Sequence, residues 1–418
     1  MEKRQAILIG PFAQVVTMDN LPLKGKLSDS ELEVLGGGQW ILLEDELIST
    51  IGPYKRLKKD AESVDLEIVH LTRGAVCLPG FVDCHTHICY GGSRANDYAA
   101  RNNGLSYLEI AEQGGGIWDT VTQTRKATAK SLEHDTIMRA ERHLAEGVTT
   151  MEVKSGYGLS VNEELIMLRA IANANQKTQA DLISTCLAAH ILPKDFQGTQ
   201  QEYLCKIHQE LLPKVLSQNL SKRVDIFIEK GAFDRTNSLD YLNKAKGLGF
   251  DVTIHADQFS IGGSKLAVEI GAVSADHLEA SKGRDIEELA KSDVVAVALP
   301  GASMGLGMAF APARKLLDAG ACLAIASDWN PGSAPMGDLL MQAAVLGASE
   351  KLSNAEVLAG ITYRAAAALS LADRGKICRG FLADLAIFPC QHFNEILYHQ
   401  GKLKPHKIVK KGKLLGAI

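Results

Sequence analysis

Residues 76–87 read VCLPGFVDCHTH, and this stretch decides how the rest of the chain is interpreted. Its first part is a short apolar run, which is typical of a buried strand. Its last part places His85 and His87 two residues apart. Because side chains two apart on an extended backbone point the same way, both imidazoles face one side. The stretch therefore predicts a buried strand that ends in two histidines arranged to hold a metal ion.

Downstream of this stretch, short apolar runs alternate with longer helical patterns such as SLEHDTIMRAERHLAEG. The predicted strands are 80–84, 148–153, 181–187, 224–229, 251–255, 272–276, 294–299 and 322–327. Eight strand–helix repeats over about 250 residues have the size and rhythm of a (β/α)8 barrel of the TIM type. The predicted fold class is therefore α/β, with one barrel.

Further β patterns flank the barrel at both ends. AILIG, AQVVTM and WILLEDELISTIG precede it, and KICRGFLADLAIFP and HKIVKKGKLL follow it. Neither flank is large enough to form a comfortable domain alone, so we expect the two to pair. The predicted organisation is a composite β-sandwich domain, 1–75 with 365–418, beside a barrel spanning 76–364.

Composition narrows the class of protein. With 418 residues, 46% hydrophobic and 22% charged, the chain can bury a large core, which excludes general disorder. The balance of 45 Lys+Arg against 49 Asp+Glu argues against a nucleic-acid partner. No apolar run approaches the roughly 18–20 residues of a membrane helix. The eight cysteines form no Cys-x-x-Cys pair and no export signal is evident, so we expect free thiols in a cytoplasmic protein.

Polar side chains gather at the predicted strand ends, where barrels of this kind carry their active sites. They are His85, His87, Lys154, His190, Glu229, His255, His277 and Asp328. A single histidine is usually a hydrogen-bonded or exposed imidazole. Five histidines at one face of a barrel, together with an aspartate, favour a metal site instead.

These residues carry a resemblance to a known family. PGFVDCHTH, GGSRANDY, SYLEIAEQGGGI, SGYGL, HADQFS, SADHLE and SDWNPGSAP are similar to segments of the imidazolonepropionases of the amidohydrolase superfamily. The His-x-His element is common to the superfamily, whereas GGSR, SGYG and the Asn-Pro-Gly after Asp328 point to this one family. The resemblance implies a hydrolase that opens the cyclic amide of 4-imidazolone-5-propanoate with water, giving N-formimidoyl-L-glutamate in histidine degradation.

The resemblance also implies roles for individual residues. One Zn²⁺ or Fe ion per subunit would be held by His85, His87, His255 and Asp328. The substrate would contact Arg94, Tyr157 and His190, and the glutamate-like end of the product would contact Asn330, Gly332 and Ser333. The residue types agree, since such a ligand set leaves room for a water that the metal activates. Arg94 offers a planar fork suited to a carboxylate. The family resemblance further suggests a homodimer.

The sequence leaves two candidates for the general base, Asp328 and His277. Some relatives, as the resemblance implies, place a glutamate where this chain has Gln258, and glutamine cannot accept a proton at neutral pH. Asp328 could accept the proton of the water, and His277 could orient the water or protonate the leaving ring nitrogen. Gln258 is then expected to be a hydrogen-bonding contact to the ring.

Other features have simpler interpretations. Lys154 and Lys230 could bridge a second metal only if modified, and we expect solvated or ion-paired amines and a single ion. Cys84 should point away from the metal and pack in the core. The glycines at 114–116 would permit a loop that closes over the substrate, which the sequence leaves open.

Two alternative functions compete with this one. Another amidohydrolase reaction, such as deamination, could use the same barrel, because this fold hosts many reactions. A catalytically inactive scaffold of this fold is the other alternative. Arg94 and the SDWNPGS segment favour the first reaction, and the intact ligand set argues against a scaffold.

Overall fold

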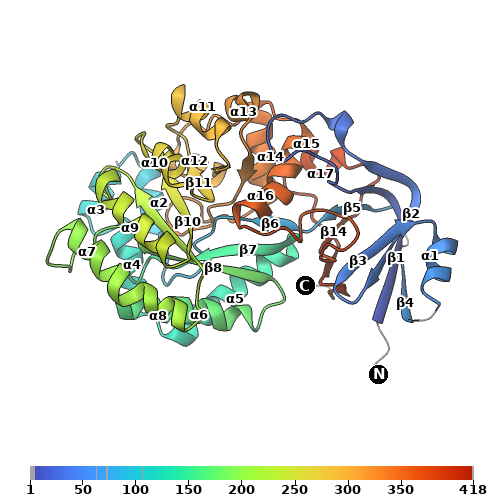
Figure 1. Cartoon of the computed structure of the whole chain (residues 1–418), viewed down its shortest axis with the longest axis horizontal. Coiled ribbons are helices and arrows are strands. Elements are labelled where there is room, and N and C mark those ends of the chain that lie inside the picture. Colours follow the sequence, from blue (N-terminus) through green and yellow to red (C-terminus); the bar gives the residue numbers. More distant parts are fainter. Residues whose placement is uncertain (1–4, 63, 72–73, 106, 417–418) are drawn as a thin grey trace.

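The structure, a computed structural model, describes residues 5–62, 64–71, 74–105 and 107–416. It consists of a barrel and a sheet built from both ends of the chain (Figure 1). In Figure 1 the blue strands of the first residues and the red strand β14 lie together on one side, and the barrel lies on the other. The predicted α/β barrel with an attached β domain is confirmed.

Eight parallel strands form the barrel. They are β6 (Phe81–Asp83), β7 (Val148–Lys154), β8 (Asp181–Ala189), β9 (Arg223–Ile228), β10 (Asp251–Ala256), β11 (Ser274–His277), β12 (Val295–Ala298) and β13 (Leu323–Ile325). Neighbours in the chain are neighbours in the sheet. Beyond the ends of β6 and β13, Thr86 and Trp329 form a parallel bridge, and the barrel is nearly closed. Each predicted strand is found with ends shifted by at most two residues.

Helices cover the outside of the barrel. They are α5 (Ala129–Ala145), α6 (Val161–Asn175), α7 (Gln200–Lys206), α8 (Leu212–Ser217), α9 (Arg235–Gly247), α10 (Gly263–Ile270), α11 (Arg284–Lys291), α12 (Pro300–Leu306), α13 (Ala313–Ala319), α14 (Leu339–Glu350), α15 (Asn354–Gly360) and α16 (Tyr363–Ala368). Helix α6 shows why they form. Ser160 caps it by accepting from Glu163 N, and Leu165, Leu168 and Ile171 bury one face at helical spacing.

The longest connection of the barrel follows β6 and supplies one wall of the site. It contains α2 (Ala95–Asn102), α3 (Tyr107–Glu112) and α4 (Ile117–Lys126) before α5 begins. The glycines at 114–116 lie between α3 and α4, and Gly116 adopts a φ of 77°. An added Cβ at Gly115 would lie 2.6 Å from Asp97 Oδ1. This segment is therefore packed closely against α2.

The terminal sheet joins strands from both ends of the chain. It contains β1 (Gln5–Val16), β2 (Val34–Glu44), β3 (Leu47–Gly52), β4 (Asp65–His70), β5 (Val76–Pro79), β14 (Leu385–Phe388), β15 (Lys407–Lys410) and β16 (Lys413–Leu414), with α1 (Tyr54–Asp60) and α17 (Asn394–Tyr398) outside it. Strand β5 pairs with both β1 and β14 and leads directly into β6. The domain boundaries at residues 76 and 365 stay a prediction.

Ion pairs connect this sheet to the amino ends of the barrel strands. Asp181, the first residue of β8, lies 2.6 Å from Arg374 Nη1 and 2.9 Å from Lys410 Nζ. Lys410 is also 2.6 Å from Asp384, and Arg374 also donates to Thr150 on β7. Among the residues described above, no helix is long and apolar enough to cross a membrane.

Candidate active site

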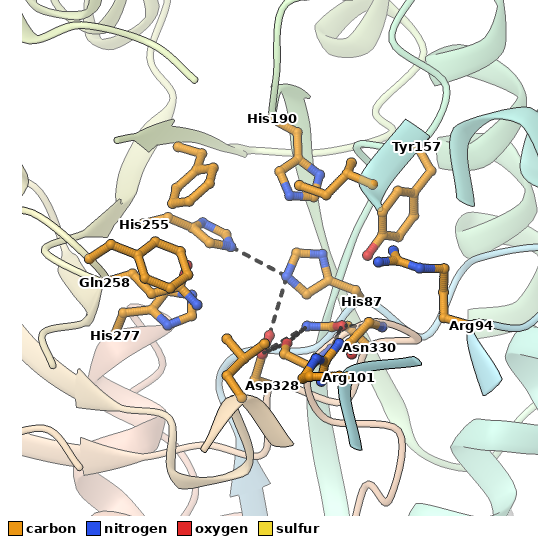
Figure 2. A pocket seen from close by; sticks show the side chains of 16 residues that line it. His87, Arg94, Arg101, Tyr157, His190, His255, Gln258, His277, Asp328 and Asn330 are labelled. Carbon is orange, nitrogen blue, oxygen red and sulfur yellow. Dashed lines mark hydrogen bonds and ion pairs between the residues drawn. The ribbon is translucent and has the colours of Figure 1, made fainter. Parts of the chain in front are cut away.

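The four side chains expected to hold a metal converge at the carboxyl end of the barrel. Figure 2 shows three of them, His87, His255 and Asp328. His87 Nε2 lies 3.2 Å from His85 Nε2 and 3.3 Å from His255 Nε2. Asp328 Oδ1 lies 3.6 Å from His85 Nε2 and 3.5 Å from His87 Nε2. Donor atoms about 2.0–2.2 Å from one tetrahedral zinc ion would be about 3.3–3.6 Å apart. The spacing therefore fits a single ion.

The protonation of these groups also fits a cation. Burial lowers the pKa of His85 and His87 well below the ordinary value, and it lowers the pKa of His255 to about 3. His85 Nδ1 donates to Asp276 Oδ2 at 2.6 Å, and His255 Nδ1 lies 2.9 Å from Asp225 Oδ2. With hydrogens on Nδ1, the Nε2 atoms of His85 and His255 carry lone pairs toward the centre.

Asp328 adds a buried atom that needs a partner. Its Oδ1 is without a hydrogen-bond partner in the described part of the chain, although it faces two imidazole nitrogens. Neutral imidazole nitrogens with lone pairs cannot satisfy a carboxylate oxygen, whereas a divalent cation satisfies both kinds of atom. The donor set of three imidazoles and one carboxylate therefore fits zinc or iron.

His277 has a different electrostatic environment. Burial alone would lower its pKa, but the Glu279 and Asp328 carboxylates raise it above the ordinary value. The His277 ring lies 5.3 Å from the His255 ring, centre to centre. Its backbone φ is 88° and that of Asp328 is 49°, a strained region for side chains of this kind. His277 is the histidine of the cluster best able to carry a proton.

The segment after Asp328 holds that carboxylate in place. Asp328 Oδ2 accepts from Asn330 Nδ2 and Ser333 Oγ, both at 2.8 Å, and burial raises the pKa of Asp328 to about 6. Asn330 Oδ1 accepts from Gly332 N at 2.7 Å and Ser333 N at 2.9 Å. Asn330, Gly332 and Ser333 line the pocket, and their contact with the product stays a prediction. Their polar atoms are hydrogen-bonded to one another in this structure.

Arg94 and Tyr157 lie across the pocket from His277 and Gln258 (Figure 2). Arg94 is buried, and its Nε donates to Asp97 Oδ2. The same oxygen accepts from Gly116 N at 2.9 Å. Arg94 is therefore an internal side chain rather than a surface ion pair, and Asp97 links it to the 114–116 segment.

His190 and Gln258 complete the predicted set. His190 Nδ1 donates to Gly156 O at 3.0 Å, and burial lowers its pKa to about 4. Its Nε2 is then an acceptor. Gln258 belongs to a loop that Glu229 fixes, because Glu229 Oε2 accepts from Phe259 N and Ser260 N at 2.9 and 3.0 Å. Glu229 at the end of β9 is thus a backbone anchor.

Lys154 belongs to the interior of the barrel. Its side chain is completely buried at the end of β7, and Glu152 and Asp225 lie 2.7 and 2.8 Å from its Nζ. Burial lowers the pKa of this ammonium, but Asp225, Glu152 and Asp276 together raise it above its ordinary value. The expected ion-paired amine is confirmed.

Several pocket residues were not predicted from the sequence. They are Arg101, Ile117, Phe227, Phe259 and Leu306. Arg101 donates to Gly305 O at 2.5 Å and to Gly332 O at 3.2 Å. A usable signal existed, because Arg101 follows Arg94 by seven residues, which is two helical turns and the same face. The apolar residues carried no comparable signal.

Comparisons with known proteins agree with this geometry. Residues 111–408 match the amidohydrolase family. The imidazolonepropionase of Bacillus cytotoxicus is 38% identical over 98% of this chain and 96% of its own, and that of Bdellovibrio bacteriovorus is 36% identical over 99% and 97%. The zinc complex of atrazine chlorohydrolase from Arthrobacter aurescens (16% identity, TM-score 0.74, 98% and 95% covered) and a zinc-bound adenosine deaminase from Xanthomonas campestris (18%, 0.70, 98% and 92%) share the fold. The chain therefore belongs to the imidazolonepropionase family of amidohydrolases.

Proposed function

We propose that this chain hydrolyses the cyclic amide of 4-imidazolone-5-propanoate to N-formimidoyl-L-glutamate, a step of histidine degradation. The family relationship extends over nearly the whole chain. The observation that carries the proposal is the arrangement of one pocket: the orphaned Asp328 Oδ1 among imidazoles on one side, and the Arg94 guanidinium on the other. A substrate with an amide at one end and a carboxylate at the other suits both.

The proposed metal ligands are His85, His87, His255 and Asp328, holding one zinc or iron ion per subunit. A divalent ion bound there would act as a Lewis acid and lower the pKa of a bound water toward about 7. A single ion rather than two is supported by the residues that could hold a second one. The Glu229 carboxylate is engaged with backbone N–H groups, and the Lys154 amine is paired with carboxylates.

The other pocket residues orient the substrate. Arg94 would bind the propionate carboxylate, because a guanidinium fixed by Asp97 is a preorganised fork. His190, neutral with Nδ1 on Gly156, would accept from a ring N–H through Nε2. Tyr157 and Gln258 would contact the ring from opposite sides of the pocket. Asn330, Gly332 and Ser333 would hold the glutamate-like end of the product.

Proton transfer would involve Asp328 and His277. Asp328 Oδ2 is saturated by Asn330 and Ser333, so Oδ1, the oxygen that would also face the ion, is the one that would take a proton from water. His277 lies beside the proposed ligands, with a ring nitrogen within 4.8 Å of those of His85 and His255, and would deliver a proton to the ring nitrogen of the substrate as the C–N bond breaks. Gln258 cannot replace either of them, because an amide does not ionise at neutral pH.

We also propose that the protein is a homodimer and that it is located in the cytoplasm, a reducing compartment. All eight cysteines are free, and six of them are buried, which suits a reducing compartment. Light scattering at micromolar concentration tests the assembly, with twice the chain mass expected and the single-chain mass contradicting it.

The direct test is an assay with imidazolonepropionate. We expect loss of the ring absorbance together with one equivalent of formimidoylglutamate, and much weaker turnover of an imidazolone without the carboxylate. Absence of ring opening by metal-replete protein would contradict the proposed reaction. Equal turnover of both compounds would instead indicate a broader amidohydrolase.

A further inference from the structure

A closed cluster of charged side chains lies inside the barrel, behind the histidines of the site. At its centre Lys154 Nζ is 2.7 Å from Glu152 Oε2, 2.8 Å from Asp225 Oδ2 and 3.9 Å from Asp276 Oδ2. The side chains of all four residues are at most 1% exposed. Because water does not reach them, these charges depend on one another for compensation, and on Arg223, whose Nε lies 3.7 Å from Glu152 Oε1.

Two of these carboxylates also contact histidines of the site. Asp225 uses the same Oδ2 atom for Lys154 Nζ and for His255 Nδ1, at 2.8 and 2.9 Å. Asp276 uses Oδ2 for His85 Nδ1 at 2.6 Å and points the same atom toward Lys154. The Lys154 ammonium is thus linked to His255 through Asp225 and to His85 through Asp276.

Such carboxylates orient imidazoles that bind metals. A carboxylate on Nδ1 keeps the hydrogen there, fixes the plane of the ring and increases the basicity of Nε2. Lys154 is placed to hold Asp225 by direct contact and to offset the mutual repulsion of three buried acids, Glu152, Asp225 and Asp276. Without that ammonium, the acids would separate or rearrange, and the rings would lose their fixed orientation.

Strand β7, which carries Glu152 and Lys154, is also hydrogen-bonded through its backbone to the His-x-His segment. Lys154 N donates to Thr86 O at 3.0 Å, and Thr86 Oγ1 donates to Glu152 O at 2.5 Å. Thr86 lies between His85 and His87. A substitution of the Lys154 side chain leaves these main-chain contacts in place, so it isolates the effect of the ammonium.

We propose that Lys154 is a positioning residue for the metal site, which sets the affinity of the protein for its ion through Asp225 and Asp276. This inference rests on the proposed metal ligands. It predicts that removing the ammonium loosens metal binding specifically, in addition to any general loss of stability.

Lys410 provides a matched control. It is also a buried lysine between two carboxylates, with Nζ 2.6 Å from Asp384 and 2.9 Å from Asp181, but it lies at the opposite end of the barrel. Both Lys154→Met and Lys410→Met remove a buried ammonium. Only the first should change the metal site.

The test measures the zinc dissociation constant of each purified full-length protein by competition with a chromophoric chelator, alongside thermal unfolding and the visible spectrum of the cobalt-substituted form. We expect Lys154→Met to raise the dissociation constant by about 10–100-fold and to alter the cobalt spectrum. Lys410→Met should stay within about threefold of wild type. Lys154→Arg, which keeps the charge, should bind zinc more tightly than Lys154→Met.

Wild-type affinity in folded Lys154→Met would overturn the inference while leaving the metal site intact. If Lys154→Met does not fold, Lys154→Gln, which retains an uncharged donor on a side chain one atom shorter, is measured by the same criteria. Wild-type protein that binds no zinc or iron would overturn the metal site itself and this inference with it. An equal loss of affinity in Lys410→Met would also overturn it, because the effect would then be one of general stability.

Discussion

The two ends of the barrel differ in whether their buried carboxylates have partners. At the amino end, Asp181 is matched by Arg374 and Lys410, so a carboxylate of the barrel is neutralised by cations near the terminal sheet. At the carboxyl end, Asp328 Oδ1 faces imidazole nitrogens without a partner in the described residues, and His277 has a strained backbone. A satisfied cluster stabilises the fold, whereas an unsatisfied and strained cluster marks a place built to bind something.

The largest effect on turnover is expected from removing a metal ligand at the carboxyl end of the barrel. His255→Ala should lower turnover of imidazolonepropionate by at least about a thousandfold, because the metal would lose a ligand and the water its activation. Metal content should fall in parallel. His399→Ala, at an exposed position, is the control and should retain both. Retained turnover in His255→Ala would remove this residue from the metal site.

The next effect separates binding from chemistry at the same end. Arg94→Ala should raise KM for imidazolonepropionate by about 10–100-fold, since a hydrogen bond to a charged group contributes about 1.5–3 kcal/mol. Turnover of an imidazolone without the carboxylate should change little. An unchanged KM for the natural substrate would mean that the carboxylate binds elsewhere, with Arg101 the nearest candidate.

The amino end should respond in stability and not in chemistry. Burial raises the pKa of Asp181, but Lys410, Lys411 and Arg374 outweigh it and lower the pKa from 3.8 to about 2. Asp181→Asn should therefore lower the free energy of unfolding by about 2 kcal/mol at neutral pH.

The pH dependence has a definite sign. Because the folded pKa of Asp181 is depressed, its stabilisation is complete above pH 3.8 and is lost as the pH falls toward about 2. Denaturant unfolding of wild type and Asp181→Asn should therefore differ most at pH 7 and converge as the pH drops below about 4. A constant difference, or a loss of kcat in the variant, would contradict the contrast between the two ends.

The smallest effect is expected at Cys84, which lies beside the two histidines in the sequence. Its side chain packs among Val82, Val297 and other apolar residues, and burial raises the pKa of its thiol well above the ordinary value. Cys84→Ala should change kcat by less than about threefold and lower stability modestly, as expected for a small cavity. A large loss of kcat with unchanged metal content would assign the thiol a chemical role.

Sequence patterns predicted the barrel well because its strands are short apolar runs bounded on both sides by polar or glycine residues typical of turns. The predicted strand at 148–153 is β7 (Val148–Lys154), and the strand at 251–255 is β10 (Asp251–Ala256). The run VCLPGFVD is harder: the predicted strand at 80–84 corresponds to β6, but the apolar residues before it were not assigned to a separate strand of the other sheet. The structure divides it at Gly80, where an added Cβ would lie 2.4 Å from Thr149 Oγ1, so β5 and β6 serve different sheets.

Most of the predicted site residues line one pocket because they follow strand ends, which a sequence can reveal. The cluster around Lys154 is different, since it depends on which strands are neighbours and in what register. Glu152, Asp225 and Asp276 come from three strands and are far apart in the chain. Likewise, the hydrogen bonds that link Asn330 to Asp328 depend on the conformation of one loop.

The central claim is that the unsatisfied carboxyl end holds one catalytic ion, and a metal titration tests it most directly. Protein stripped with a chelator should not open the imidazolone ring, and turnover should return in proportion to added zinc or iron up to about one equivalent per chain. Full activity of the stripped protein, or activity that rises until about two equivalents are bound, would contradict the claim.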